Sequence, residues 1–424
     1  MYNSFQKLLG SAFVRSVAIV GMGGIGAQAI ALLFSPILTR MFGPDEMGAL
    51  SLFVSLTALG GQIGTLSYHN AVPLAKSDGE MLALVKLCQR GAQVFSLLSA
   101  MILVFAFFFQ GAFSGFSGRF QDYWALPVAI YIIAECNASN ALLIVKGAFR
   151  ASSIATVLQS LFNGFFSVLA GLALGSAQAL ILANVLSHVG RYYFLSKAKD
   201  GVCSALALDG EVPSLRSVAR EHKGFLLYRA PQEIINAVAA NIPILFLGYQ
   251  YGVEAVGYYG LAMRVLAVPS TVIGQAVGPV FYPKISKAIL EKRDATRLIT
   301  TLTIALGLAG SVPYGLIVIF GESIFEFVFG PFWVQGGEYA RWLALWCWCG
   351  LMNVAAMRAI PALNLHKHFL FIELIGLLLR VLVLLSGRTL GLTSVQIVAF
   401  LSGIGCLINC FLIVLVLICS RKAE

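Results

Sequence analysis

Apolar segments of about twenty residues recur along the whole of this 424-residue chain. A helix needs roughly that length to cross the hydrocarbon core of a bilayer, and a chain inside lipid must satisfy its own backbone hydrogen bonds. Only 11% of the residues are charged, whereas a soluble domain has about a quarter. We therefore predict an all-α integral membrane protein with about twelve transmembrane helices. The predicted spans are 16–39, 47–69, 91–110, 123–145, 154–174, 177–195, 225–249, 256–280, 298–320, 339–360, 369–386 and 394–418.

The positions of lysine and arginine predict the orientation of these spans. Most of the 29 basic residues fall in segments that are cytoplasmic if the N-terminus is cytoplasmic, and such an excess marks that face of a membrane protein. An even number of spans then places both termini in the cytoplasm. The net charge of +10 is explained by this topology, so nucleic acid is not an expected partner. The apolar stretch from Ser16 is too long for a cleavable signal peptide, and we expect it to be the first span.

The longest connection is charged and divides the spans into two sets of six. We expect an N-terminal lobe at 1–196, a cytoplasmic linker at 197–224 and a C-terminal lobe at 225–424.

The two halves also resemble each other. Asp45-Glu46-Met47-Gly48 follows Pro36, and Glu254-Ala255-Val256-Gly257 follows Pro243 at a similar distance. Chance recurrence of proline and glycine in membrane helices is the alternative explanation. A duplication of six spans predicts two lobes of the same orientation, which in transporters hold the substrate at their interface.

Motifs of soluble enzymes are weak or missing in this sequence. The segment 17–26 matches a strand followed by G-x-G-x-x-G, but no alternation of strands and helices follows, so we expect close helix packing there and no dinucleotide. No P-loop motif occurs, and the eight cysteines lack the paired spacing of a zinc site. We expect no enzyme activity, no metal and no bound cofactor.

Arg264 is the charged residue that most suggests a binding site. It lies within a predicted span, where a charge costs about 2.5–3.5 kcal/mol and usually faces a bundle interior or a wet cavity. No acid lies one turn away on the same helix, and a guanidinium can bind phosphate through two hydrogen bonds. Binding of an anion and a structural ion pair with an acid of another helix, such as Glu135, remain equal alternatives.

Acids and amides inside other spans suggest ion coupling. Glu233 and Asn236 lie near the start of the seventh span, Glu373 lies at a similar depth in the eleventh, and Glu135 lies in the middle of the fourth. Together the first three could hold a proton or a sodium ion. Hydrogen bonding between helices is the alternative. Glu373 and Arg380, seven residues apart, are expected to share one face of their helix.

Further polar and aromatic residues are candidates for a substrate cavity or for the membrane interface. Gln28, Gln62 and Arg40 are the candidates for lining a cavity of the first half, and His69 could join them. Trp342, Trp346 and Trp348 crowd one span near the outer interface, where packing is the default and stacking on sugars the alternative. His366-Lys367-His368 lacks a third ligand for a metal, and we expect it to anchor a helix at the interface.

The run from Ser35 to Gly48, with Arg40, resembles the opening of the Wzx-type O-antigen and polysaccharide flippases, which are relatives of the MATE exporters and the lipid II flippases. The resemblance implies a V-shaped pair of six-helix lobes in the bacterial inner membrane. It also implies movement of an undecaprenyl-diphosphate-linked oligosaccharide from the cytoplasmic to the periplasmic leaflet, beside other polysaccharide-assembly proteins of the membrane. Arg264 would then bind the diphosphate. Glu233 and Glu373 partly match the cation site of the lipid II flippases, although the twelfth span has no acid.

Two alternatives belong to other classes of protein. A MATE-type exporter of small molecules commonly has an acid in its first span, and 16–39 has none. A membrane glycan polymerase or glycosyltransferase typically needs sizeable outer loops, and the predicted outer loops are short. The sequence does not identify the sugar, the coupling ion or the oligomeric state.

Overall fold

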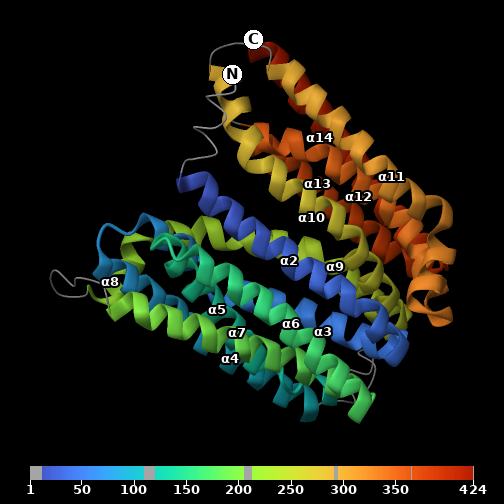
Figure 1. Ribbon diagram of the computed structural model, residues 1–424, viewed down its shortest axis with the longest axis horizontal. Coiled ribbons are helices and arrows are strands. Elements are labelled where there is room, and N and C mark those ends of the chain that lie inside the picture. The colour runs from blue at the N-terminus through green and yellow to red at the C-terminus, as the bar shows by residue number, and fades with distance from the viewer. Residues whose placement is uncertain (1–11, 109–119, 205–212, 291–294, 364, 424) are drawn as a thin grey trace. The chain divides into compact units, whose positions relative to one another are not determined.

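The computed structural model describes residues 12–108, 120–204, 213–290, 295–363 and 365–423, in which all regular structure is helical (Figure 1). Twelve helices of the described part have 20 or more residues. They are α2 (Ala12–Met41), α3 (Pro44–Gly64), α4 (Asp78–Phe108), α5 (Leu126–Val145), α6 (Phe149–Ala173), α7 (Ala177–Ser204), α9 (Ala230–Tyr251), α10 (Val253–Leu290), α11 (Ala295–Phe329), α12 (Val334–Ala359), α13 (His366–Thr389) and α14 (Ser394–Ala423). The prediction of an all-α chain is confirmed.

Ten helices of the described part are long and apolar enough to cross a membrane. The two long helices outside this set are α7 and α12, which carry charged residues such as Arg191 and Arg341. The chain is therefore a multi-pass membrane protein, and for α7 and α12 the predicted crossing stays a prediction.

Several helix boundaries differ from the predicted spans, among them those of α3, α7 and α11. Helix α3 ends at Gly64, five residues before the predicted end, because Leu66 and Ser67 adopt left-handed backbone angles with φ of 49° and 58°. Helix α7 continues to Ser204, so it extends into the predicted linker. Helix α11 continues to Phe329 beyond a kink at Phe320, whose φ of −114° and ψ of 18° are not helical.

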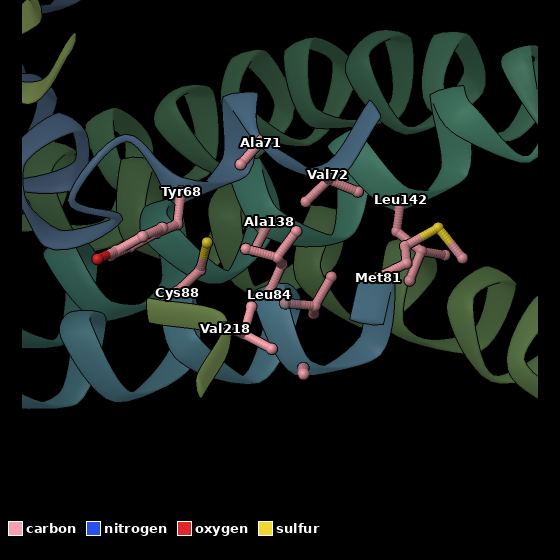
Figure 2. Close-up of a cluster of buried hydrophobic side chains, with 11 residues drawn as sticks. Tyr68, Ala71, Val72, Met81, Leu84, Cys88, Ala138, Leu142 and Val218 are labelled. Atoms are coloured by element: carbon pink, nitrogen blue, oxygen red, sulfur yellow. The ribbon is translucent and has the colours of Figure 1, made fainter. Parts of the chain in front are cut away.

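The first compact unit, Ser11–Val256, contains α2 to α9. In this unit α2 packs against α6, α6 against α7, α5 against α3, α4 and α7, and α9 against α3. The short helix α8 (Leu215–Glu221), which lies in the predicted linker, packs on α4. Figure 2 shows Val218 of α8 inserted into a buried cluster with Leu84 of α4 and Leu142 of α5. This cluster fixes the position of the segment that links α3 to α4.

Two glycines of the first unit permit close contact of backbones. A Cβ on Gly48, in the repeated motif, would lie 1.9 Å from the carbonyl oxygen of Val253. A Cβ on Gly23 would lie 2.6 Å from the Cβ of Ser153 on α6. The segment 17–26 lies inside helix α2, so the expected close helix packing is confirmed and the strand of a dinucleotide motif is excluded.

The described residues of the second compact unit lie within Gly257–Glu424. Here α11 packs against α12, and α14 against α12 and α13. Tyr258 at the start of α10 makes edge contacts with Trp333 and Tyr339, with ring centroids 5.9 Å apart in both pairs. The contacts assign α9 to the first unit, whereas the predicted C-terminal lobe, 225–424, includes this helix. The division into lobes at 1–196 and 225–424 stays a prediction.

Candidate functional site

Glu233, in the first turn of α9, is the centre of the densest polar cluster of the first unit. Its Oε1 accepts a hydrogen bond from Asn70 Nδ2 at 2.7 Å and forms an ion pair with Arg229, whose Nε lies 3.2 Å away. Its Oε2 accepts from Ser67 Oγ at 2.5 Å and from Gln62 Nε2 at 3.1 Å. A carboxylate has about four acceptor positions, and three hydrogen bonds with one ion pair give both oxygens of Glu233 partners.

Two of the donors to Glu233, Ser67 and Asn70, come from a strained link between α3 and α4. Leu66 and Ser67 both have positive φ, and a non-glycine residue costs about 1–3 kcal/mol in such a conformation unless its surroundings enforce it. The hydroxyl of Thr65 donates to the carbonyl of Gln62 at 3.1 Å, and it lies 2.9 Å from Nδ1 of His69. The strained turn thus directs Ser67 and Asn70 towards the same carboxylate.

The other side of the cluster is formed by the chain entering α9. Phe225–Arg229 forms one wide π-type turn, and Pro231 occupies the first turn of α9. Such turns occur often at functional sites. Arg229 lies four residues before Glu233, and half of its side chain is exposed, so its ion pair contributes less to stability than a buried pair would.

His69 is the titratable group beside this cluster in the link between spans. Burial lowers the pKa of its imidazole below the usual 6.5, while Glu233 raises that pKa and Arg229 lowers it, both to smaller extents. The ring is therefore held neutral near pH 7. Because His69 is neutral, Arg229 is the positively charged residue next to Glu233.

Several predicted partners of Glu233 are not brought to it. Asn236 is exposed one turn further along α9. Asn241 instead accepts a hydrogen bond from Ser55 on α3 at 2.7 Å and donates to the carbonyl of Ala237. Glu373 lies half-buried on α13 in the second unit, so a shared site with Glu233 stays a prediction.

Glu135 lies deep inside the first unit on α5, where 2% of the residue is exposed. Its Oε2 accepts a hydrogen bond from Gln89 on α4 at 2.9 Å, whereas its Oε1 is buried without a partner. Ser139, one turn later, is also buried with an unpartnered hydroxyl. Asn140 accepts from Ser152 at 2.5 Å and serves helix packing.

The candidates for a cationic substrate chamber are distributed over both units. Arg264 is half-buried on α10 of the second unit, between the buried Leu261 and Leu266. In the first unit, Gln28 is half-buried on α2 and Arg40 is exposed in the last turn of that helix. Gln62, in contrast, belongs to the Glu233 cluster. A common cavity of these four residues stays a prediction.

In the second unit, Arg380 on α13 is buried, with its guanidinium 5.5 Å from the ring centre of Trp346 on α12. No ion pair among the described residues joins Arg380 to Glu373, so their expected common face does not bring their charges together. Trp348 donates its indole N–H to the carbonyl of Gly307 at 2.9 Å, which is a packing role, while Trp342 is exposed.

The predicted interfacial cluster His366-Lys367-His368 is described only in part by the structure. His368 is exposed, and the side chains of His366 and Lys367 lie outside the described residues.

Sequence reasoning missed Ser67, Asn70, Gln89 and Ser139 as site residues. Ser67 lies near the end of the predicted span 47–69 and Asn70 just after it, where polar residues are expected and attract no notice. Gln89 lies just outside a predicted span, and a serine in a membrane helix is common. Ser67, Asn70 and Gln89 are distinguished only by their hydrogen bonds to two acids, and Ser139 by its buried hydroxyl without a partner one turn from Glu135.

Comparison with known proteins agrees with this architecture. The model of the family described as polysaccharide biosynthesis protein matches residues 37–336. The succinoglycan biosynthesis transport protein ExoT of Rhizobium meliloti (strain 1021) is 19% identical over 338 residues, which cover 78% of this chain. The chain spans about 65% of that protein's length.

Two solved structures have the same fold. An inward-facing MATE family multidrug resistance transporter of the MOP superfamily is 14% identical and has a TM-score of 0.68, with 93% of this chain and 95% of the other covered. The lipid II flippase MurJ in an inward closed conformation is 13% identical and has a TM-score of 0.70, with 96% and 87% covered. Since the family match extends over more than half of the chain, this multi-pass membrane protein belongs to the polysaccharide biosynthesis protein family.

Proposed function

We propose that this protein moves a polyprenyl-diphosphate-linked oligosaccharide, such as an O-antigen repeat unit, from the cytoplasmic to the periplasmic leaflet of the bacterial inner membrane. The family match over residues 37–336 carries this proposal. The similarity to a succinoglycan transport protein and to a lipid II flippase supports a lipid-linked glycan as the substrate. Both termini would lie in the cytoplasm.

Arg264 is the residue proposed to bind the diphosphate, with Gln28, Gln62 and Arg40 as further candidates for contact with the substrate. The half-buried position of Arg264 within an apolar helix supports this role, because a desolvated guanidinium binds phosphate more strongly than one in water. The protein would act without covalent chemistry, by exposing the bound glycan to one side of the membrane and then to the other. A proton or sodium gradient would drive it, with Glu233, Asn236, Glu373 and Glu135 as candidate coupling residues.

A deletion strain of the host bacterium tests the substrate. Loss of this protein should remove surface polysaccharide and cause lipid-linked oligosaccharide to accumulate in the inner leaflet. Expression of wild type should restore surface glycan, whereas Arg264→Ala at equal membrane abundance should not. Arg264→Lys should restore it in part, since lysine keeps the charge but not the paired donors. Normal surface glycan with altered tolerance of toxic small molecules would instead indicate an exporter.

A further inference from the structure

Two acids of the first unit, the half-buried Glu233 and the buried Glu135, differ in how well their oxygens are satisfied. Glu233 accepts three hydrogen bonds and forms an ion pair with Arg229, so both of its oxygens have partners. Glu135 accepts one from Gln89, and its Oε1 is the only buried carboxylate oxygen without a partner among the described residues. Leaving such an oxygen unsatisfied in an apolar interior costs several kcal/mol. A ligand is therefore expected at Glu135 and not at Glu233.

A second unsatisfied oxygen lies on the same side of the same helix. Ser139 follows Glu135 by four residues, a spacing that makes side chains neighbours on a helix. The serine is 1% exposed, and its hydroxyl has no partner. Helix α5 thus presents one carboxylate oxygen and one hydroxyl oxygen, both buried and both lacking a donor.

Among the described residues, no basic side chain forms an ion pair with Glu135. Arg191 of α7 instead donates to Gln159 at 3.0 Å, and its charge acts on Cys136 and His188. The titratable groups that interact with Glu135 are uncharged in their ordinary forms. They are Tyr131, whose side chain also forms a hydrogen bond with Glu135, and Cys136 on α5, Cys88 on α4 and Tyr192 on α7.

We propose that Glu135 and Ser139 form a binding site for a monovalent cation, either a proton or sodium. A single carboxylate balances one positive charge, whereas calcium and magnesium take six or more oxygen ligands that usually include several carboxylates. This inference rests on the proposed transport function, for which it selects the coupling residue from the four candidates. It assigns Glu233 a positioning role at the start of α9.

Thermal unfolding of the purified protein in lipid nanodiscs tests the site without any substrate. Sodium chloride is compared with choline chloride at pH 8, and choline chloride is then titrated from pH 8 to pH 5. For a sodium site, sodium should raise the wild-type midpoint by about 2–4 °C, the shift expected from a modest binding energy. For a proton site, acidification should stabilise wild type relative to Glu135→Gln by a similar amount. His69 is present in both proteins, so its own titration cancels in this difference.

Ser139→Ala and Ser167→Ala form a matched pair of variants. Both serines are buried in the first unit with unpartnered hydroxyls, but only Ser139 lies one turn from an acid. Ser139→Ala should weaken the apparent affinity for sodium several-fold, or shift the pH of the proton response, while Ser167→Ala should leave both unchanged. If Glu135→Gln does not fold, the comparison of Ser139→Ala with Ser167→Ala still tests the site.

Dicyclohexylcarbodiimide, which adds to protonated carboxyl groups in apolar surroundings, gives a direct second measurement. Mass spectrometry should find the adduct on Glu135 and not on Glu233. Sodium should suppress the adduct if sodium is the ligand, and should leave it unchanged if a proton is the ligand. Equal sodium and pH responses of wild type, Glu135→Gln and Ser139→Ala would overturn the proposal. That result would not affect the conclusion drawn from the glycan assay with Arg264→Ala. Conversely, a negative glycan assay would not affect the measurement of ion binding at Glu135.

Discussion

The hydrogen bond from Ser67 to Glu233 should contribute more to stability than an equally buried bond between neutral groups. Ser67 is 1% exposed and its hydroxyl lies 2.5 Å from a carboxylate oxygen. Ser55 is 2% exposed, also on the α3 side of the contact with α9, and donates to the neutral amide of Asn241 at 2.7 Å. Hydrogen bonds to charged groups contribute about 1.5–3 kcal/mol, and neutral ones about 0.5–1.5 kcal/mol. Ser67→Ala should therefore cost about 1 kcal/mol more than Ser55→Ala.

A double-mutant cycle removes the effect of the strained backbone at Ser67. That strain is common to all four proteins of the cycle made from Ser67→Ala and Glu233→Gln, so it cancels in the interaction energy. We expect an interaction energy of about 1–2 kcal/mol, since the glutamine substitution keeps an acceptor but removes the charge. The free energy of unfolding would be measured by reversible denaturation in mixed micelles. An interaction energy below about 0.5 kcal/mol, or equal costs for the two serines, would refute the reasoning.

Three further predictions follow from contacts within single units. Burial lowers the pKa of His69, so below pH 6.5 the unfolded chain binds more protons than the folded chain. Stability should therefore fall as the pH decreases from 6.5 towards the lowered pKa. The substitution His69→Gln should flatten that part of the pH profile of the unfolding midpoint. A Cβ on Gly337 would lie 2.5 Å from a backbone carbonyl of α11, whereas one on Gly315 meets nothing within 4 Å; Gly337→Ala should lower the midpoint, and Gly315→Ala should leave it equal or raise it slightly. Cysteines replacing Ser55 and Asn241 should form a disulfide that joins α3 to α9. Mass spectrometry would detect it as a reductant-sensitive intramolecular cross-link. Glycan export measured with and without reductant then shows whether these helices separate during transport.

Much of the fold could be predicted because lipid imposes a simple length and composition on each helix. Helix α6 ends at Ala173, within a residue of the predicted 174, since Gly175 has a φ of 56° and stops it. The end of helix α11 was harder to predict, because the hydropathy of the sequence decreases at the kink near Phe320 although the helix continues to Phe329. An apolar run identifies the part of a helix in lipid, and it carries no information on the turns that project beyond it.

The site was less predictable, because polarity in an apolar run identifies a residue but not its partner. Glu233 and Gln62 were both selected from the sequence, yet their hydrogen bond joins positions 171 residues apart. Likewise, the sequence marks Glu135 and Glu233 as equal candidates for ion coupling. They differ only in their donors, and those donors come from a strained turn and from a neighbouring helix, neither of which has a motif.

Helix α9 is where the predicted halves and the observed units disagree, and the disagreement has a mechanical meaning. If the half that begins at 225 moves as one body, the hydrogen bonds that Glu233 accepts from α3 and from the α3–α4 link must break in every transport cycle. Three donors from that side on one carboxylate make the separation costly. If α9 instead moves with the first unit, these hydrogen bonds persist. The contacts that place α9 in the first unit favour the second arrangement, in which Glu233 keeps its donors.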